Sequence, residues 1–457
     1  MNFCWLKMSR IFQPAHILPA NAVEKSKTIS KSYKYLLRYG IIKQVNTGMY
    51  ALLPLGLRVM DKLSVLVDTE MAKIEAQKLL LPSLSSSKLW KKTDRLKDNR
   101  NELFMLKDRY EQQYILNPTC EETICDLISS IKFFSSKSFP LRLYQISHKW
   151  RDEIHPHLGF LRGREFLMKD LYTFDINLEN AQHTYKMVCE SYNNIFKKIG
   201  LDFVKAVGDA GSIGGDLSHE YHYVTDIGED IVLGCPSCNY FENKTICKVS
   251  HCPQCNNELV KHKTAEVGHA FLLGTKYSKP LNACYNHNNR LSPLVMGCYG
   301  LGLSRILTVA VEVLSINEGI RWPKFLAPYS VCIIPPKAGS KEENASQYIN
   351  EITNILNDLN IDAIIDDRTD LTIGKRSVFA GATGYPYLII IGKSAMEQTP
   401  LFEIVDVYTS KDIKISLESM KDYFKKLLPK FPFLSIFYQL EDRHSIMTNS
   451  NNDLAWH

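Results

Sequence analysis

The sequence predicts a mixed α/β (α+β) protein, in which a large first domain is built on an antiparallel sheet and a compact α/β domain follows. Residues 141–174 contain two long strand patterns around a short loop, the arrangement of an antiparallel pair. From Pro328 onward, apolar strand patterns alternate with a helical one. The chain has 457 residues, which is too long for one ordinary core, so more than one domain is expected.

The composition is that of an ordinary soluble globular protein, with 45% hydrophobic and 23% charged residues. A net charge of +6 permits a polyanionic partner without requiring one. No apolar run approaches about 18 residues, so no membrane span is expected. The 12 cysteines lie in a long chain without a secretory signal, which favours metal ligands or free thiols over disulfides.

The first 22 residues resemble a mitochondrial presequence. They include the basic residues Lys7 and Arg10 among bulky apolar ones, and the first acidic residue is Glu24. The segment has little Arg or Ser, so a basic terminus without a targeting role remains the alternative. We therefore expect the mitochondrial matrix as the location, with the cytoplasm as the alternative.

A long helix is predicted over residues 55–76, because apolar side chains recur there at spacings of three and four. These side chains are Val59, Leu63, Leu66, Val67, Met71 and Ile74. The next stretch, Gln77–Leu81, becomes apolar and stops at Pro82. We expect it to form an edge strand that the proline ends.

The two strands predicted within residues 141–174 are LRLYQISHKWRDE and RGREFLMKDLYTF, joined by IHPHLGFL. Alternation places polar and aromatic side chains together on one face of each strand. They are Arg151 and Glu153 in the first strand and Arg162, Phe166 and Met168 in the second. Such a surface suits a flat, charged ligand, although solvated charges on an exposed hairpin are the commoner explanation.

Residues 291–314 predict an apolar strand, the glycine-rich stretch GCYGLGLSR and then a helix. The buried stripe of this helix is Leu303, Ile306, Leu307, Ala310 and Leu314. Arg305 lies off the stripe, in the first turn after the glycines. Glycines allow a ligand to approach the backbone closely, but Gly-x-Gly alone is weak evidence.

The C-terminal domain is predicted to span about a hundred residues after Pro328. Its expected strands are Val331–Ile334, Ile361–Ile365, Tyr387–Ile391 and Phe402–Tyr408, and its expected helix carries the stripe Tyr348, Ile352, Ile355, Leu356 and Leu359. Residues after about 432 have little to fold around and are expected to form a disordered tail.

Taken in order, these segments resemble a class II aminoacyl-tRNA synthetase, and specifically a prolyl-tRNA synthetase of the bacterial and mitochondrial type. The three class motifs correspond to the long helix ending at Pro82, to WRDE (150–153) with RGREF (162–166), and to GCYGLGLSR (297–305). Four more segments resemble the proline-specific family: NPTCEE (117–122), GSIGGDLSHEY (211–221), EVGHAFLLGTKYS (266–278) and RWPKFLAPY (321–329). The resemblance extends from about Ser26 to Lys426.

The resemblance implies an antiparallel-sheet catalytic domain at residues 23–327, a mixed α/β anticodon-binding domain at 328–432 and a tail at 433–457. It implies activation of L-proline by ATP with Mg²⁺ to give prolyl-adenylate, and transfer of the prolyl group to tRNA(Pro). A homodimer is implied too, with the helix and strand that end at Pro82 in the subunit interface.

Three alternatives remain open. Another class IIa synthetase, such as threonyl or glycyl, is disfavoured by the EVGHAF and TCEE segments. A catalytically inactive accessory subunit that binds nucleic acid or a partner would typically have lost the motif arginines, which are all present. Adenylation of an amino acid for a different acceptor fits poorly with an apparent anticodon domain.

Amino-acid activation brings a carboxylate to the α-phosphate of ATP, so the catalyst must position two anions and neutralise their charge. A guanidinium can hold carboxylate and phosphate oxygens together. By resemblance, Arg151 takes this catalytic role, Phe166 stacks on adenine, and the second catalytic arginine, Arg305, covers the other side of the nucleotide. The remaining implied ATP contacts are Arg162, at the γ-phosphate, Glu153, Glu266 and His269.

The residues that the resemblance implies for the proline pocket are Thr119, Glu121, Arg151, Phe271 and Cys298. The Glu121 carboxylate pairs with the secondary ammonium of proline in this interpretation. Cys120 departs from the bacterial pattern, which usually has histidine there, so the direction of its side chain matters for the pocket. His219 and Glu220 are weaker candidates.

The C-terminal domain carries a DDR…GK pattern that resembles class IIa anticodon-binding domains. The matching residues are Asp366, Asp367, Arg368 and Lys375. Acidic side chains can accept hydrogen bonds from base edges, and cationic ones can contact phosphates. The stretch after Lys375 lacks the family's usual acidic residue, and a solvated charge cluster at a strand end is the alternative.

Two Cys-x-x-Cys pairs, Cys235/Cys238 and Cys252/Cys255, are separated by 13 residues. This spacing favours a tetrahedral Zn²⁺ site with four thiolates. Cys247 and His251 are spare candidate ligands, and thiols without metal are the alternative.

The cysteine pairs lie in residues 231–265, where typical bacterial relatives insert an editing domain of about 180 residues, far longer than an ordinary loop. A site closed by four thiolates has no open position at which to activate water. We therefore expect a structural zinc clip and no editing of alanyl-tRNA by this chain.

Overall fold

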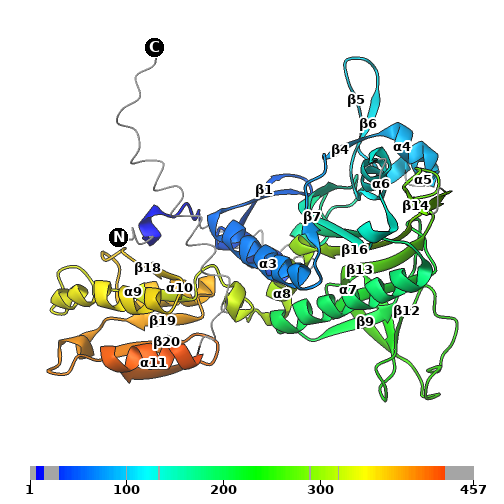
Figure 1. Cartoon of the computed structure of the whole chain (residues 1–457). Helices are drawn as coiled ribbons and strands as arrows, with labels where there is room; N and C mark the ends of the chain where they lie inside the picture. Colours follow the sequence, from blue (N-terminus) through cyan, green and yellow to red (C-terminus); the bar gives the residue numbers. More distant parts are fainter. Residues whose placement is uncertain are drawn as a thin grey trace, which may run out of the picture.

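The computed structural model of the chain describes residues 7–14, 30–98, 100–131, 134–287, 290–316 and 319–427. Figure 1 shows two domains side by side, the larger in blue to green and the smaller in yellow to orange. The predicted tail, residues 433–457, and most of the predicted presequence, residues 1–6 and 15–22, lie outside the described residues. No helix within the described ranges is long and apolar enough to cross a membrane.

The larger domain is built on a nine-stranded sheet with the order β10-β9-β12-β11-β13-β16-β8-β7-β3. Its neighbouring strands are antiparallel, except for the parallel pairs β3–β7 and β12–β9. The strands are β3 (Gln77–Lys78), β7 (Leu141–Trp150), β8 (Glu165–Asp175), β9 (Phe203–Val207), β10 (Leu217–Val224), β11 (Asp230–Gly234), β12 (Phe241–Asn243), β13 (Val260–Gly274) and β16 (Val295–Gly302). The predicted antiparallel sheet is confirmed, and β3 is the edge strand expected before Pro82.

Three helices cover one face of this sheet, because alternation along the strands directs apolar side chains to that face. Leu171 of β8 and Tyr299 and Leu301 of β16 lie there and are completely buried. The helices are α3 (Pro54–Lys73), α7 (Leu178–Ile199, green in Figure 1) and α8 (Leu303–Leu314). The predicted helices over residues 55–76 and after the glycines of GCYGLGLSR are thus confirmed.

The sequence placed the strand ends wrongly in two places. The β7–β8 ladder closes at the pair Trp150–Glu165, so Arg151, Glu153 and Arg162 lie in the connecting loop and not on strand faces. Pairing stops there because the chain turns directly after Trp150, with the Glu153 N–H donating to Arg151 O at 2.8 Å. The strand predicted before GCYGLGLSR extends farther than expected, since β16 continues through GCYGLG to Gly302.

Smaller elements surround the sheet and its covering helices. They are α2 (Lys31–Arg38), β1 (Ile42–Asn46), β2 (Met49–Leu52), β4 (Leu84–Ser86), α4 (Ser87–Lys92), α5 (Arg95–Asp98), η2 (Arg100–Glu102), β5 (Met105–Lys107), β6 (Gln113–Leu116), α6 (Glu121–Ser130), η3 (Ser136–Ser138), η4 (Gly159–Leu161), β14 (Cys284–His287), β15 (Arg290–Pro293) and η5 (Lys324–Leu326). Three of these strands form a sheet in the order β4-β6-β5, from which the β5–β6 hairpin projects (Figure 1).

The C-terminal domain has a five-stranded sheet with the order β18-β17-β19-β20-β21. Its elements are β17 (Val331–Ile334), η6 (Glu343–Tyr348), α9 (Ile349–Asp358), β18 (Ala363–Ile365), α10 (Ile373–Thr383), β19 (Tyr387–Ile390), η7 (Lys393–Met396), β20 (Phe402–Asp406), β21 (Lys411–Ile415) and α11 (Leu417–Leu427). The four predicted strands and the predicted helix are present. Helix α10 was not predicted, because its buried face carries Arg376, Ala380 and Thr383 and so shows no large apolar stripe.

A buried ion-pair cluster joins the two domains. Asp362, just before β18, forms ion pairs with Lys62 (2.7 Å) and Arg58 (3.1 Å) of α3. The Asp362 side chain is 1% exposed. Ser330 Oγ also donates to its carboxylate at 2.6 Å. Burial acts to raise the pKa of Asp362, but the charges of Lys62 and Arg58 outweigh it and bring the pKa to about 2. The carboxylate is therefore ionised at neutral pH.

We predict that Asp362→Asn lowers the melting temperature by roughly 10 °C at pH 7, because removing one member of a buried ion pair leaves Lys62 buried without its partner. A carboxyl whose pKa is depressed by folding stabilises the protein above its unfolded pKa of about 3.9, and this contribution is lost as the pH falls toward 2. The difference between variant and wild type should therefore shrink below about pH 4.

Thermal denaturation monitored by circular dichroism at pH 7 and pH 3 measures both effects. The matched control is Asp358→Asn, which breaks the exposed Asp358–Lys421 pair and should change the melting temperature little. Equal shifts in the two variants would contradict a special role for Asp362.

Candidate active site

A cavity of about 320 Å³ opens on the face of the large sheet opposite α7. Ten side chains that the sequence singled out line it: Thr119, Arg151, Glu153, Arg162, Phe166, Glu266, His269, Phe271, Cys298 and Arg305. They come from β8, β13, β16, the β7–β8 loop, the start of α8 and the segment before α6. Residues predicted for ATP and for proline thus meet in one cavity.

Strand alternation forms the floor of the cavity. On β8, Phe166, Met168 and Asp170 line it, while the alternate residues Leu167 and Leu171 pack against the helix side. On β16, the cavity side carries Cys298 followed by two glycines, Gly300 and Gly302. Because these glycines have no side chain, the floor beside Met168 stays low enough for a flat group to lie on it.

Arg151 lines the cavity and is held there through its backbone. Its backbone N–H donates to Arg164 O at 2.9 Å, which anchors the loop, and its guanidinium lies 5.3 Å from the centre of the Phe166 ring. Among the residues that the structure describes, none accepts a hydrogen bond or forms an ion pair with this guanidinium. Burial, and then the positive charge of nearby Arg305, lower the pKa of Arg151. An anion in the cavity would relieve both effects.

Arg305, in the first turn of α8, is held by backbone carbonyls. Its Nε donates to Leu161 O at 3.0 Å and its Nη1 to Glu266 O at 2.8 Å. The Glu266 carboxylate contacts His269 Nδ1 at 3.1 Å. Burial acts to raise the pKa of Glu266, but His269 and Arg305 lower it to about 2, so the carboxylate is ionised. The ring of His269 stacks on Phe271 with centroids 3.8 Å apart.

Arg162 lies at the open rim, and its positive charge is balanced by two carboxylates. Its Nε donates to Glu153 at 2.8 Å and its Nη1 to Glu229 at 3.0 Å, and the Arg162 side chain is 44% exposed. Glu229 also contacts His157 at 2.8 Å. Glu153, whose contact could not be assigned from the sequence, is therefore the partner of Arg162.

Glu121 does not line the cavity but lies behind three residues that do line it. Its carboxylate accepts hydrogen bonds from Thr119 Oγ1 (2.7 Å) and Cys298 Sγ (2.9 Å), and it forms an ion pair with Arg95 (3.1 Å). Burial acts to raise the pKa of Glu121, but Arg95 and these hydrogen bonds lower it. Arg95 also pairs with Glu122 at 3.1 Å, so one guanidinium serves two buried carboxylates.

Sequence reasoning missed Arg95 and Asp170, which also line the cavity. Asp170 pairs with Lys149 at 2.9 Å and accepts from Gln145 and Tyr172, each at 2.9 Å. The alternation of side chains along β8 could have revealed Asp170, because Asp170 lies on the same strand face as Phe166 and Met168. Nothing in the local pattern around Arg95 indicates its partners, which lie 26 and 27 residues away.

Cys120, which replaces the histidine usual in bacterial relatives, does not line the cavity. The Cys120 side chain is 2% exposed, and its sulfur is contacted by Gln145 Nε2 (3.4 Å) and Lys149 Nζ (3.5 Å). The weaker candidates are also outside the cavity lining. His219 Nδ1 contacts Tyr185 OH at 2.8 Å, and Glu220 is buried against Asn243 and His222.

The four residues of the predicted anticodon site lie where β18 ends and α10 begins, but two of them satisfy each other. Arg368 donates two hydrogen bonds to Asp366, at 2.8 and 2.7 Å, and Asp366 is completely buried. The Arg368 guanidinium also lies over the Phe379 ring, 4.5 Å from its centre. Asp367 is half-buried and Lys375 is exposed, so these two are the more accessible to a ligand.

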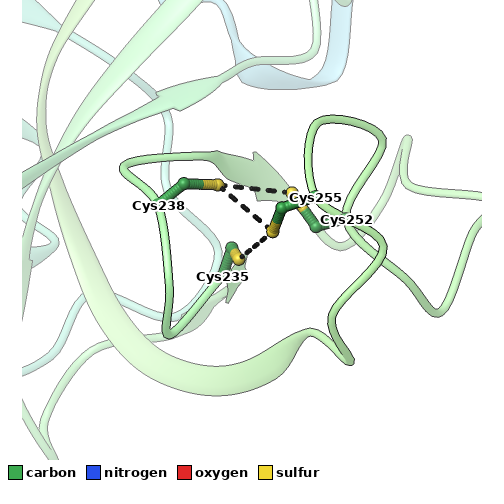
Figure 2. Close-up of side chains that lie close together, drawn as sticks. All are labelled: Cys235, Cys238, Cys252 and Cys255. Carbon is green, nitrogen blue, oxygen red and sulfur yellow. Dashed lines mark hydrogen bonds between the residues drawn. The ribbon is translucent and has the colours of Figure 1, made fainter.

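The four cysteines of the two pairs converge in one cluster, shown in Figure 2. Their sulfur atoms all lie within 4.8 Å of one another, with separations of 3.3 Å for Cys235–Cys255, 3.4 Å for Cys238–Cys252 and 3.8 Å for Cys238–Cys255. Four sulfurs around Zn²⁺ at about 2.3 Å would be about 3.8 Å apart, so the cluster fits the ion. The spare candidates are not part of it: Cys247 donates to Val249 O, and His251 contacts Ser250.

Comparison with known proteins identifies both domains. Residues 104–314 match the family described as tRNA synthetase class II core domain (G, H, P, S and T), and residues 330–427 match the anticodon binding domain family. The structure superimposes on prolyl-tRNA synthetase from Cryptosporidium parvum complexed with halofuginone and AMPPNP with a TM-score of 0.72, at 18% identity over 87% of this chain and 76% of that one. The synthetase from Giardia lamblia in complex with prolyl-adenylate gives 0.70, at 19% identity over 85% and 74%. At such identities these matches establish the fold.

Sequence relatives are considerably closer. A protein from Rattus norvegicus named probable mitochondrial proline–tRNA ligase is 44% identical over 91% of this chain and 90% of its own length. Its counterpart from Homo sapiens is 46% identical over 87% and 86%. A proline–tRNA ligase from Ehrlichia canis is 36% identical over 86% and 95%. The chain therefore belongs to the proline–tRNA ligases, a family of class II aminoacyl-tRNA synthetases.

Proposed function

We propose that this chain is a mitochondrial proline–tRNA ligase that forms prolyl-adenylate from L-proline and ATP and transfers the prolyl group to tRNA(Pro). The relatives named mitochondrial proline–tRNA ligase support both the activity and the location. The observation that carries the proposal is the cavity in which Arg151 has no acceptor among the described residues. Residues 23–327 form the catalytic domain and 328–432 the anticodon-binding domain in this proposal.

The proline carboxylate attacks the α-phosphate of ATP, and pyrophosphate leaves. Arg151 holds an oxygen of each reacting anion, so that they approach without repelling each other. Phe166 and Arg305 enclose the adenine from its two faces. Arg162 exchanges one of its two carboxylate partners for the γ-phosphate, since its exposed guanidinium has donors on more than one side.

ATP carries Mg²⁺ in this proposal. Carboxylate oxygens suit this ion, and Glu266, ionised and facing the nucleotide part of the cavity, fits as a ligand together with phosphate oxygens. The ion supplies positive charge at the phosphates when bound. His269 keeps the Glu266 carboxylate in position through the hydrogen bond at its Nδ1.

The proline pocket lies at the deep end, between Thr119, Phe271 and Cys298. Glu121 supplies negative charge from behind Thr119 and Cys298, because Arg95 and the hydrogen bonds from these two residues lower the pKa of its buried carboxyl. A secondary ammonium can therefore be attracted to this end, while its carboxylate reaches Arg151. Phe271 gives the pyrrolidine ring an apolar wall.

Proline-dependent ATP–pyrophosphate exchange tests the activity. We expect exchange with proline and little with threonine, glycine or alanine, and we expect Arg151→Ala to reduce it at least about 100-fold because the transition-state charge is no longer neutralised. The control Arg109→Ala removes an exposed arginine from the β5–β6 hairpin and should leave exchange unchanged. Folded wild-type protein without a proline signal would refute the proposal, and near-normal exchange by Arg151→Ala would refute the role of this residue.

We further propose that the four-cysteine cluster binds one structural Zn²⁺. Elemental analysis of protein purified under reducing conditions should find one zinc per chain, and Cys252→Ser should remove it, because three thiolates bind the ion more weakly than four. Cys247→Ser is the matched control and should retain the metal. Metal-free wild-type protein would overturn the assignment.

The same cluster leads us to propose that the chain does not edit. A site closed by four thiolates has no position for a hydrolytic water. Alanyl-tRNA(Pro) incubated with the enzyme should therefore deacylate no faster than in buffer, and rapid release of alanine would contradict this.

We also propose a homodimer formed through α3 and the segment from β3 to Pro82, where Leu57 and Leu80 are exposed. Light scattering of the active enzyme tests it, and an active monomer would rule it out.

A further inference from the structure

Residues 7–14, here called the N-terminal strap, lie against the C-terminal domain although the sequence resembles a presequence there (Figure 1, dark blue). Lys7 forms a parallel bridge with Ile365 at the outer edge of β18. Ser9 donates twice to Asp367, from its backbone N–H to Oδ1 at 2.9 Å and from its hydroxyl to Oδ2 at 2.6 Å. Met8 of the short helix η1 (Met8–Arg10) is 5% exposed.

The other end of the strap is fixed to the catalytic domain. Gln13 Nε2 donates to Tyr39 O at 2.9 Å. Pro14 passes so close to Gly40 that a Cβ there would come within 2.9 Å of Pro14 O, and Gly40 has a φ of +62°. The strap is therefore packed at both ends, which is not the behaviour expected of an unfolded targeting sequence.

The exposed side chains of the strap are of the types that single-stranded RNA-binding surfaces use. Lys7 and Arg10 are exposed, and Phe12 is 66% exposed. Cations contact phosphates of an RNA loop, and exposed aromatic rings stack on its bases. The strap presents both directly beside Asp367, a residue of the predicted anticodon site.

Few side-chain donors and acceptors of the predicted anticodon site are available to contact RNA. Asp366 and Arg368 are bound to each other, and both carboxylate oxygens of Asp367 accept from Ser9. Burial acts to raise the pKa of Asp367, but the hydrogen bonds from Ser9 and then the charge of Lys7 lower it. Asp367 thus serves to hold the strap, and exposed Lys375 is the one cation of the predicted site without a bound acid among the described residues.

We propose that the N-terminal strap is a working part of the anticodon-binding surface, in which Lys7 and Arg10 contact phosphates of the tRNA anticodon loop and Phe12 stacks on one of its bases. Ser9 and Asp367 fix the strap in place for this contact. The inference rests on the proposed function, and it requires that residues 7–14 remain in the active mitochondrial enzyme. Any presequence that is removed then ends before Lys7.

The test compares the Michaelis constant for tRNA(Pro) in aminoacylation with proline-dependent pyrophosphate exchange, which does not involve tRNA. Lys7→Ala/Arg10→Ala should raise this constant roughly tenfold and flatten its dependence on salt, because two phosphate contacts are lost. Phe12→Ala should raise it by a similar factor, and Phe12→Trp should restore it, because indole also stacks. Exchange should stay at the wild-type level in all of them.

The matched control is Lys411→Ala/Lys414→Ala, which removes two exposed cations from β21 at the opposite edge of the same sheet and should leave the tRNA constant unchanged. An unchanged Michaelis constant for tRNA(Pro) in the strap variants overturns the inference. A lowered Michaelis constant overturns it as well, since the strap would then cover the site. So does a mitochondrial enzyme whose N-terminus, determined by mass spectrometry, lies after Pro14. Absence of exchange in the wild type would instead reject the proposed function.

Discussion

The alternation of side chains in the nine-stranded antiparallel sheet is the constraint on which the rest of the catalytic domain depends. Once α3, α7 and α8 cover one face, the residues between the covered ones must face the other way. Phe166, Met168 and Asp170 reach the cavity floor for this reason, and their positions are fixed by the hydrogen-bonded ladder. Only the cavity rim depends on loops, and the most important one is anchored by the Arg151 N–H. A rigid floor with an anchored rim keeps charged groups in place before substrates arrive.

Most charged side chains of the cavity have a partner of opposite charge, but Arg151 does not have one among the described residues. Arg162 and Arg95 each have two carboxylate partners, and Glu266 has His269 and the neighbouring Arg305. Arg151 has no such partner among the described residues and lies near another cation. Burial and the charge of Arg305 disfavour the charged form of Arg151, and the nearby carboxylates of Glu266, Glu102 and Glu153 offset these effects only in part, so the pKa of Arg151 stays lowered. In the proposed function, ATP and the carboxylate of proline bring negative charge to this position, which would localise binding and reaction at Arg151.

Local patterns in the sequence predicted what depends on near neighbours: the long helix α3, the β7–β8 pair, the antiparallel sheet and the convergence of Cys235, Cys238, Cys252 and Cys255. Contacts between distant segments could not be predicted. Arg95 and Glu121 form an ion pair across two helices, and Lys62 and Asp362 are 300 residues apart in sequence. Strand ends at Arg151 and Arg162 were misplaced, because a turn directly after Trp150 ends the ladder earlier than the residue pattern indicates. That the spare candidates Cys247 and His251 stay outside the cysteine cluster could be seen only in the structure.

Strand β13 has a consequence for how this architecture can change over evolutionary time. It runs without interruption from Val260 to Gly274, about 50 Å at 3.3 Å per residue. The cysteine cluster precedes its first residue, whereas Glu266, His269 and Phe271 face the cavity farther along. Because the ladder to β16 and β10 fixes the later part, a module of almost any size can be exchanged at the beginning of the strand while the cavity keeps its shape. The strand thus separates a cysteine-bearing segment that can vary from a cavity whose side chains are fixed by the ladder.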